Sequence, residues 1–331
     1  MLAWPLVAWS ASLAWPPSLG WHPPGVARAE DGPATAATGT RDADWLERLR
    51  RSADALRWSD ELIRHDWRLQ RRPDTGACRI LDPRDAVVHE GDHEACLDAF
   101  AGLERAGRIP AVEGPAVIVL HGLGEGRRSM RPLVEHLRKK TAATVLSFGY
   151  ASTSAGLDDH GRALASVIAG LPAADAISFV GHSMGNLVVR RWMTLAEEPD
   201  LARIRRMVML GPPNQGSELA RIVSKVDVLA SLSQGAARDL VLDWNRISRD
   251  LAVPSCPFGI VAGGKGDDRG YSRLLVGDDD AVVRVEETRL PGARDFLLLP
   301  VHHAAMMKNP RVQQATAAFL TTGRFAPDTA E

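Results

Sequence analysis

The stretch ISFVGHSMGNLVVRRW (residues 177–192) contains three patterns that together decide the fold. Its first four residues form a short run of mostly apolar residues, which is typical of a strand buried on both faces of a parallel sheet. The part from Met184 to Trp192 has apolar residues spaced as on one face of a helix. Between them lies Gly-His-Ser-Met-Gly, with a glycine two residues before and two residues after the serine. This order predicts that Ser183 occupies a sharp strand-to-helix turn, where small neighbours avoid clashes.

The same alternation of apolar run and helical stretch repeats along the chain. It is typical of an α/β fold, a mostly parallel central sheet with helices on both faces. We expect strands over 116–122, 144–150, 177–183, 207–213, 258–264 and 295–301. We expect helices over 129–140, 157–170, 184–197, parts of 217–251 and 310–322. Ligands of such sheets bind beyond the carboxyl ends of the strands, so the residues that follow each run are the candidates for function.

The region before this alternation predicts a different arrangement. The segments WRLQ (67–70) and CRIL (78–81) flank RRPDTGA, which predicts an antiparallel hairpin with a glycine-containing turn. Helical spacing indicates one helix over 44–64 and another over 92–106. The boundaries that we expect are one domain over 45–325, made of N-terminal helices and hairpin (45–110) and a core (111–325), with 217–255 long enough for a helical cap.

The N-terminus has features of an export signal. The run MLAWPLVAWSASLAW is apolar, and Ala27-Arg28-Ala29 offers an A-x-A cleavage site. We expect a signal peptide over 1–29, atypical because no Lys or Arg precedes Arg28, and a flexible linker over 30–44. The run is too short and too interrupted by proline for a transmembrane helix. We therefore expect a periplasmic or secreted protein, and a cytoplasmic one if the signal does not work.

Charge and cysteine usage narrow the classes of partner. The 331 residues are 45% hydrophobic and 24% charged, and their formal net charge is −1. No overall attraction to nucleic acid follows from that charge, so we expect no nucleic-acid partner. The three cysteines lack the spacing of metal ligands, and we expect no metal. Cys78 and Cys96 could form a disulfide or remain separate buried thiols. Nothing in the sequence indicates an oligomeric state.

Two later strand ends carry the groups that a reactive serine needs. A serine hydroxyl is a weak nucleophile unless a base takes its proton and a carboxylate orients that base. GDDDAVVRVEE (277–287) places carboxylates before an apolar stretch, and VHHAAMMKNP (301–310) places histidines directly after the last apolar run. The order serine, aspartate, histidine is the one that accompanies a G-x-S-x-G turn in this kind of sheet.

These residues resemble the α/β-hydrolase superfamily, in its bacterial lipase and esterase branch, and are similar to GPI inositol-deacylase-type lipases. The resemblance covers 115–325 and rests on HGLG (121–124), GHSMGN (181–186), LGPPNQGSELA (210–220), GDDDAVV (277–283) and the H-x-x-M-x-x-N-P ending. It implies the α/β-hydrolase fold and the hydrolysis of carboxylic esters. The implied substrate is a small-molecule ester or a lipid, and no cofactor is needed.

The resemblance also assigns the catalytic triad to Ser183, Asp280 and His303. Asp280 matches a D-G-x-V context in which Ala281 replaces the usual glycine. Its neighbours Asp278 and Asp279 remain alternatives for the acid, and are otherwise expected to be turn residues exposed to solvent. A calcium site formed by the acidic loop 267–280 is a further alternative reading of these carboxylates.

The base and the groups around the serine are assigned in the same way. His303 fits the spacing of the ending better than His302, which remains an alternative. The backbone N–H groups of Leu123 and Met184 are expected to form the oxyanion hole. The residues expected to contact the substrate are His121, Gly122, Gly124 and His182. Each of the two histidines has an alternative role, His121 in shaping the loop and His182 in packing beneath the turn.

Four other functions are compatible with the same residues. A thioesterase, an amidase or an acyltransferase would use the same triad, and a non-catalytic binding protein could keep the fold. An intact triad favours an enzyme. Apolar residues within 217–255 could contact a membrane surface or simply join the core.

Overall fold

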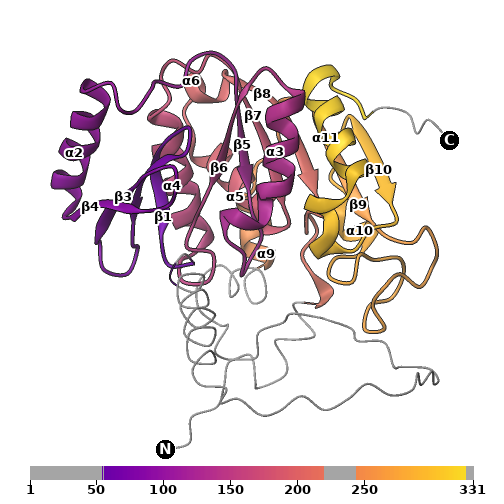
Figure 1. Cartoon of the computed structure of the whole chain (residues 1–331). Coiled ribbons are helices and arrows are strands. Elements are labelled where there is room, and N and C mark those ends of the chain that lie inside the picture. The colour runs from indigo at the N-terminus through magenta and orange to yellow at the C-terminus, as the bar shows by residue number, and fades with distance from the viewer. Residues whose placement is uncertain (1–53, 55, 220–243, 326–331) are drawn as a thin grey trace, which may run out of the picture. The chain divides into compact units, whose positions relative to one another are not determined.

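Six parallel strands form the central sheet of the computed structural model, which describes residues 54, 56–219 and 244–325 (Figure 1). The strands are β5 (Ala116–Leu120), β6 (Thr144–Phe148), β7 (Ile177–His182), β8 (Ile204–Leu210), β9 (Phe258–Gly263) and β10 (Asp295–Leu299). Their order is β10-β9-β8-β7-β5-β6, and every pairing between them is parallel. The expected parallel sheet is confirmed.

Helices cover both faces of this sheet. The long ones are α3 (Arg131–Lys140), α4 (Leu157–Ala169), α5 (Met184–Leu195) and α11 (Pro310–Thr322). Val117 and Val119 of β5 pack in one core with α3 and α11, which lie on the same side of the sheet in Figure 1. Ile118 and Leu120 pack in a second core with α4 and α5. Because both faces are buried, the strands are apolar at successive positions instead of alternating.

Shorter helices lie in the connections between these elements. They are η1 (Arg127–Met130), α6 (Glu198–Leu201), α9 (Trp244–Ile247), η3 (Ser248–Asp250), α10 (Val285–Thr288) and η4 (His303–Lys308). The six-residue η4 begins at the proposed catalytic base, directly after β10.

A second, antiparallel sheet precedes the central one. It consists of β1 (Ser59–Arg64), β2 (Trp67–Arg71), β3 (Cys78–Leu81) and β4 (Val87–Gly91), in that order. Helix α2 (His93–Arg105) packs on this sheet through a core that includes Leu69, Ile80 and Phe100. The hairpin expected from WRLQ and CRIL is confirmed as β2 and β3.

The helix expected over 44–64 is wrong at its end, because β1 occupies 59–64, whereas Asp54 is helical. Asp60 and Arg68 are both fully buried and form an ion pair of 2.6 Å. The backbone N–H of Gly149 donates to the same aspartate at 2.7 Å, which joins this sheet to the end of β6. Asp60 and Arg68 occupy buried strand positions where the sequence pattern of a strand would have apolar residues. Sequence reasoning therefore does not recognise the strand. Residues 44–53 lie outside the described part.

All described residues belong to one compact unit. The signal peptide expected over 1–29 and the linker over 30–44 fall outside the residues that the structure describes, as does 220–243, most of the cap segment. None of the helices that are described has both the length and the apolar character needed to cross a membrane.

The strand order determines which loops meet. β5 pairs with both β6 and β7, so the chain runs outward from β5 to β6 and then crosses back to β7. The loops that leave β5 and β7 therefore begin side by side, at the switch point where open parallel sheets bind ligands. One of these loops contains HGLG (121–124) and the other GHSMG (181–185).

Candidate active site

Ser183 lies in a strained turn between β7 and α5. Its φ of 51° and ψ of −124° are unusual for a residue with a side chain, and such conformations cost about 1–3 kcal/mol. The Ser183 N–H donates to the carbonyl of Leu210 at 2.9 Å, and its own carbonyl accepts from Asn186 N–H at 3.1 Å. These bonds hold the serine, half-buried, between the ends of β7 and β8.

The glycines of the turn are required by close packing. A Cβ at Gly185 would lie 2.6 Å from the carbonyl oxygen of His121, and one at Gly181 would lie 2.8 Å from the backbone nitrogen of Asn186. A Cβ at Gly122 would lie 3.1 Å from that of Ser183. A side chain at Gly185 or Gly122 would push the serine turn away from the end of β5 and its loop, and one at Gly181 would push β7 away from the start of α5.

His303 and Asp280 form a buried hydrogen-bonded pair beside this turn. His303 Nδ1 lies 2.7 Å from Asp280 Oδ2, and the His303 N–H donates to the Asp280 carbonyl at 2.8 Å. Asp280 Oδ1 accepts from the backbone N–H groups of Val282 and Val283 at 3.0 and 2.7 Å. Since a carboxylate only accepts, Nδ1 must carry the hydrogen, which leaves Nε2 able to act as a base when the ring is neutral.

The environment of His303 favours its protonated form. Burial would lower the pKa of His303, but the charge and hydrogen bond of Asp280, together with the charge of Glu125, raise the pKa above its ordinary value. The neighbouring His302 is exposed and packs at a tilted angle against Tyr271, with ring centroids 3.8 Å apart. Of the two histidines, His303 is therefore the one that faces an acid.

The two alternative acids have other partners. Asp278 accepts from the backbone N–H groups of Lys265 and Gly266 at 2.7 and 2.8 Å. Asp279 accepts from backbone N–H groups of its own loop, including that of Ala281 at 2.7 Å. We expected both carboxylates to be exposed, but Asp279 is fully buried, because it organises the loop from inside. Ala281 has a φ of 84°, a left-handed conformation that suits the glycine it replaces.

Contacts through the ends of β7 and β8 bring Ser183 and His303 together. The rings of His182 and His303 lie with centroids 4.6 Å apart. Gly211 follows the strand end that binds Ser183, and a Cβ there would lie 3.0 Å from His303 Nδ1. Among the described residues, no hydrogen bond joins the Ser183 hydroxyl to His303. Such bonds often form only when substrate binds.

The expected oxyanion donors lie on either side of the serine turn. Met184 is the first residue of α5, so its N–H has no partner within the helix. Leu123 lies in the loop after β5, and its side chain is 37% exposed. Within the described part of the chain, neither N–H group donates to another residue. Gly124 has a φ of 69° and open space around it, so it lets the loop turn without crowding the site.

His121 lies behind the loop, in contrast to our expectation that it contacts the substrate. It is fully buried and stacks on Tyr150, with ring centroids 4.1 Å apart. Its Nδ1 lies 2.9 Å from the Gly122 carbonyl, and its Nε2 accepts from the Tyr150 N–H at 3.3 Å. Burial lowers the pKa of His121 to about 4, so the ring is neutral with its hydrogen on Nδ1. His121 therefore fixes the shape of the loop.

Glu125 is a site residue that sequence reasoning missed. One of its oxygens, Oε2, accepts from the Gly122 N–H at 3.1 Å and from the Ser129 hydroxyl at 2.9 Å, and it lies 3.2 Å from His182 Nδ1. Burial would raise the pKa of Glu125, but the hydrogen bond and charge of His182 and these donors lower it to about 2. The carboxylate thus joins the loop after β5 to the residue before Ser183.

His182 continues this chain of contacts to the base. Its Nε2 lies 3.2 Å from the carbonyl of His303. The two groups that face the His182 ring, the Glu125 carboxylate and the His303 carbonyl, can only accept hydrogen bonds. Both bonds therefore exist together only when each ring nitrogen of His182 carries a hydrogen. His182 is almost fully buried beneath the turn, in line with its alternative role in packing. No sequence motif marks Glu125, because its role depends on contacts across two loops.

Glu125→Gln is expected to change the pH dependence of any reaction that needs neutral His303. Activity should be lost as the pH falls through the raised pKa of His303. Removing the Glu125 charge lowers that pKa, so the acid limb of kcat/KM should move to lower pH. Loosening the loop should also reduce kcat by about tenfold or more. Glu135→Gln, on the exposed side of α3, is the control. An acid limb that stays in place or moves upward would contradict this role.

Comparison with known proteins supports the fold assignment. No protein-family model and no curated protein matches the sequence. The mature form of the Bacillus licheniformis lipase BlEst2 is similar, with a TM-score of 0.52 and 18% identity over 65% of this chain and 96% of that chain. The propeptide form matches with a TM-score of 0.51 and 17% identity, over 67% and 54% of the two chains. The chain has the α/β-hydrolase fold.

Proposed function

We propose that this protein is a serine hydrolase that cleaves carboxylic esters, as lipases and esterases do, through an acyl-enzyme on Ser183. The observation that carries the proposal is the buried 2.7 Å contact between His303 Nδ1 and Asp280 beside the strained serine turn. A carboxylate-oriented histidine next to a serine in such a turn is the arrangement that activates the serine hydroxyl. The similarity in fold to a bacterial lipase is consistent with this reading.

The proposed reaction has two halves. In the first, the Ser183 oxygen attacks the ester carbonyl carbon while His303 Nε2 takes the serine proton. The negative oxygen of the intermediate accepts hydrogen bonds from the N–H groups of Leu123 and Met184. His303 then gives the proton to the departing alcohol. In the second half, His303 takes a proton from water as the water attacks the acyl-enzyme, and returns it to Ser183 as the acid leaves. Asp280 holds the imidazole in the required tautomer throughout.

Apolar side chains are exposed in the loops that follow β5 and β9, and they favour an apolar substrate. Leu123 follows β5, and the long loop after β9 exposes Leu274 and Val276 to 62% and 78%. Val282, two residues after the proposed acid, is also exposed. Exposed apolar groups are a feature of surfaces that bind apolar ligands or lipid. We therefore propose an ester with an apolar acyl chain, at a lipid surface or free in solution.

A panel of p-nitrophenyl esters from acetyl to palmitoyl tests this proposal. We expect kcat/KM to rise from acetyl towards medium or longer chains, because each added methylene buries more apolar surface. Matched thioester and anilide substrates distinguish the alternative activities. A higher kcat/KM for the thioester or the anilide than for the ester of the same chain would contradict an esterase. The Ser183→Ala variant measures the uncatalysed background.

A further inference from the structure

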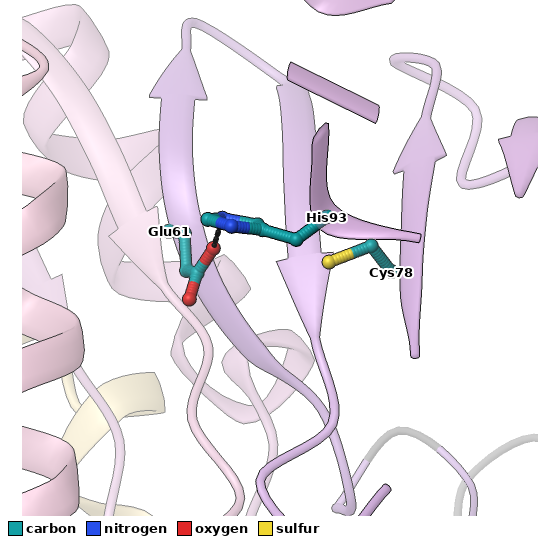
Figure 2. Close-up of side chains that lie close together, drawn as sticks. All are labelled: Glu61, Cys78 and His93. Carbon is teal, nitrogen blue, oxygen red and sulfur yellow. Dashed lines mark hydrogen bonds and ion pairs between the residues drawn. The ribbon is translucent and has the colours of Figure 1, made fainter. Parts of the chain in front are cut away.

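A cluster of metal-binding side chains lies in the N-terminal sheet, outside the elements that carry the proposed triad. Glu61 comes from β1, Cys78 from β3 and His93 from the first position of α2 (Figure 2). Each offers a donor atom, and these three atoms all lie within 4.8 Å of one another. Figure 2 shows the Cys78 sulfur pointing towards the other two side chains.

The local fold explains how three distant residues meet. The pairing of β1 with β2 shifts register between Asp60 and Leu62, so Glu61 is the extra residue of a β-bulge. Bulges redirect side chains and often lie at functional sites. Cys78 begins β3 in the core that α2 covers. The side chain of Asp92 accepts from the Ala95 N–H at 2.8 Å and so caps α2, which fixes the start of the helix.

Two of the three donor atoms are bonded to each other in the structure. His93 Nε2 lies 2.7 Å from Glu61 Oε2, whereas the other carboxylate oxygen, Oε1, lies 3.6 Å from Arg71. The arginine therefore holds the carboxylate through the oxygen that is not directed at the cluster. Cys78 is only 2% exposed, but the His93 side chain is 42% exposed. An ion could thus enter from the histidine side, where a water could complete its coordination.

We propose that Glu61, Cys78 and His93 form a zinc-binding site, with water as the fourth ligand. A thiolate, an imidazole and a carboxylate are together the ligand types of Zn²⁺, and three protein ligands with one open position are common for it. Ca²⁺ and Mg²⁺ prefer sites made only of oxygen atoms, whereas two of the three donors in this cluster are sulfur and nitrogen. This proposal revises our expectation from cysteine spacing that the chain binds no metal, and it does not depend on the proposed ester hydrolysis.

The required movement is small. Tetrahedral zinc with ordinary bond lengths places its ligand atoms about 3.3–3.8 Å apart. The 2.7 Å distance between His93 Nε2 and Glu61 Oε2 must therefore increase by about 1 Å or less. The distances from Cys78 Sγ to the other two donor atoms are at most 4.8 Å, so they must shorten by not much more than about 1 Å. Rotation of the half-exposed His93 side chain provides this movement. On binding, the Cys78 thiol loses its proton to solvent, and the His93 ring gives up its Nε2 hydrogen to solvent while keeping or gaining one on Nδ1. The hydrogen bond between His93 and Glu61 is thereby replaced by two bonds to the metal.

Cys96 provides the main competing reaction. It is buried in the same core as Cys78, and a disulfide between the two would remove the thiolate that zinc needs. In the structure both are free cysteines. Intact mass of the freshly purified protein after alkylation without a reducing agent distinguishes the two states. We expect Cys78 and Cys96 to be alkylated once the metal is removed with a chelator and the protein is denatured, because both thiols are buried in the fold. A protein that resists alkylation and is lighter by two hydrogens would overturn the proposal.

Cobalt binding tests the site directly. The full chain, with any affinity tag removed, is treated with a chelator and titrated with Co²⁺. We expect one ion per chain, with the near-ultraviolet thiolate-to-cobalt absorption and the strong visible bands of tetrahedral coordination. Addition of Zn²⁺ should remove both signals. Zn²⁺ should also raise the Tm, because an ion that binds only the folded state stabilises it. A wild-type chain without the thiolate band would overturn the proposal.

Matched variants locate the ligands. Cys78→Ser should abolish the thiolate band, whereas Cys256→Ser, which changes a cysteine outside the cluster, should keep it. His93→Ala should weaken cobalt binding by about tenfold or more. Loss of a residue that only hydrogen-bonds to a metal ligand already lowers metal affinity by about that factor, and loss of a ligand should lower it at least as much. His136→Ala, which changes a histidine of α3, is its control. Equal cobalt binding by the members of either pair would overturn the proposal. A circular dichroism spectrum identical to wild type is required of each variant.

Discussion

Replacing Ser183 with alanine is expected to reduce kcat for p-nitrophenyl ester hydrolysis by about 10⁴-fold or more, because no acyl-enzyme can form. The Ala side chain occupies no more space than the serine, so the turn and the fold should remain intact. Steady-state kinetics on purified protein measure the effect, and a thermal melt shows that the variant is folded.

Ser166→Ala is the control for this experiment, since Ser166 lies on the exposed part of α4, outside the proposed site. It should retain wild-type kcat and KM. Wild-type turnover by Ser183→Ala would remove the serine from the mechanism and with it the proposed function.

Asp280→Asn is expected to lower kcat by about 10⁴-fold, the size of effect that follows when the histidine loses its orienting carboxylate. An asparagine can donate a hydrogen to His303 Nδ1, which stabilises the tautomer that has its hydrogen on Nε2 and is unable to act as a base there. The variant also loses the charge that raises the pKa of His303, so the remaining activity should have its acid limb at lower pH.

Asp278→Asn is the matched control, because among the described residues the Asp278 carboxylate binds only the backbone N–H groups of Lys265 and Gly266. Its effect on kcat should be far smaller than that of Asp280→Asn. The opposite ranking, with Asp278→Asn or Asp279→Asn more damaging to kcat, would assign the acid to another residue of the loop.

The central sheet could be predicted from sequence because its strands are buried on both faces. The strands β5 and β7 are buried throughout and mostly apolar, and each is followed by a turn or helix signal. The candidate site followed from the same principle, since Ser183, Asp280 and His303 lie beyond the carboxyl ends of three parallel strands. The pairing of His303 with Asp280 could be expected only through the family resemblance, because spacing alone left their neighbours open.

Three features could not be predicted because polar side chains meet over long sequence distances. Strand β1 was mistaken for helix because a buried aspartate pairs with Arg68 from the next strand. Glu125 contacts His182 from another loop, which no local pattern indicates. The proposed zinc ligands come from a bulge, a strand and a helix start, and therefore lack the short spacing of zinc motifs. In each case tertiary contacts, and not local sequence, give the residue its role.

The most direct test of the proposed mechanism is labelling with a fluorophosphonate probe, followed by identification of the modified residue by peptide mass spectrometry. Fluorophosphonates react with serines that a neighbouring base activates, so we predict one label per chain, on Ser183, and a parallel loss of esterase activity. The label should be absent from Ser183→Ala and strongly reduced in His303→Ala. Stoichiometric labelling of another residue, or full ester turnover by unlabelled protein, would contradict the assignment of Ser183 as the nucleophile.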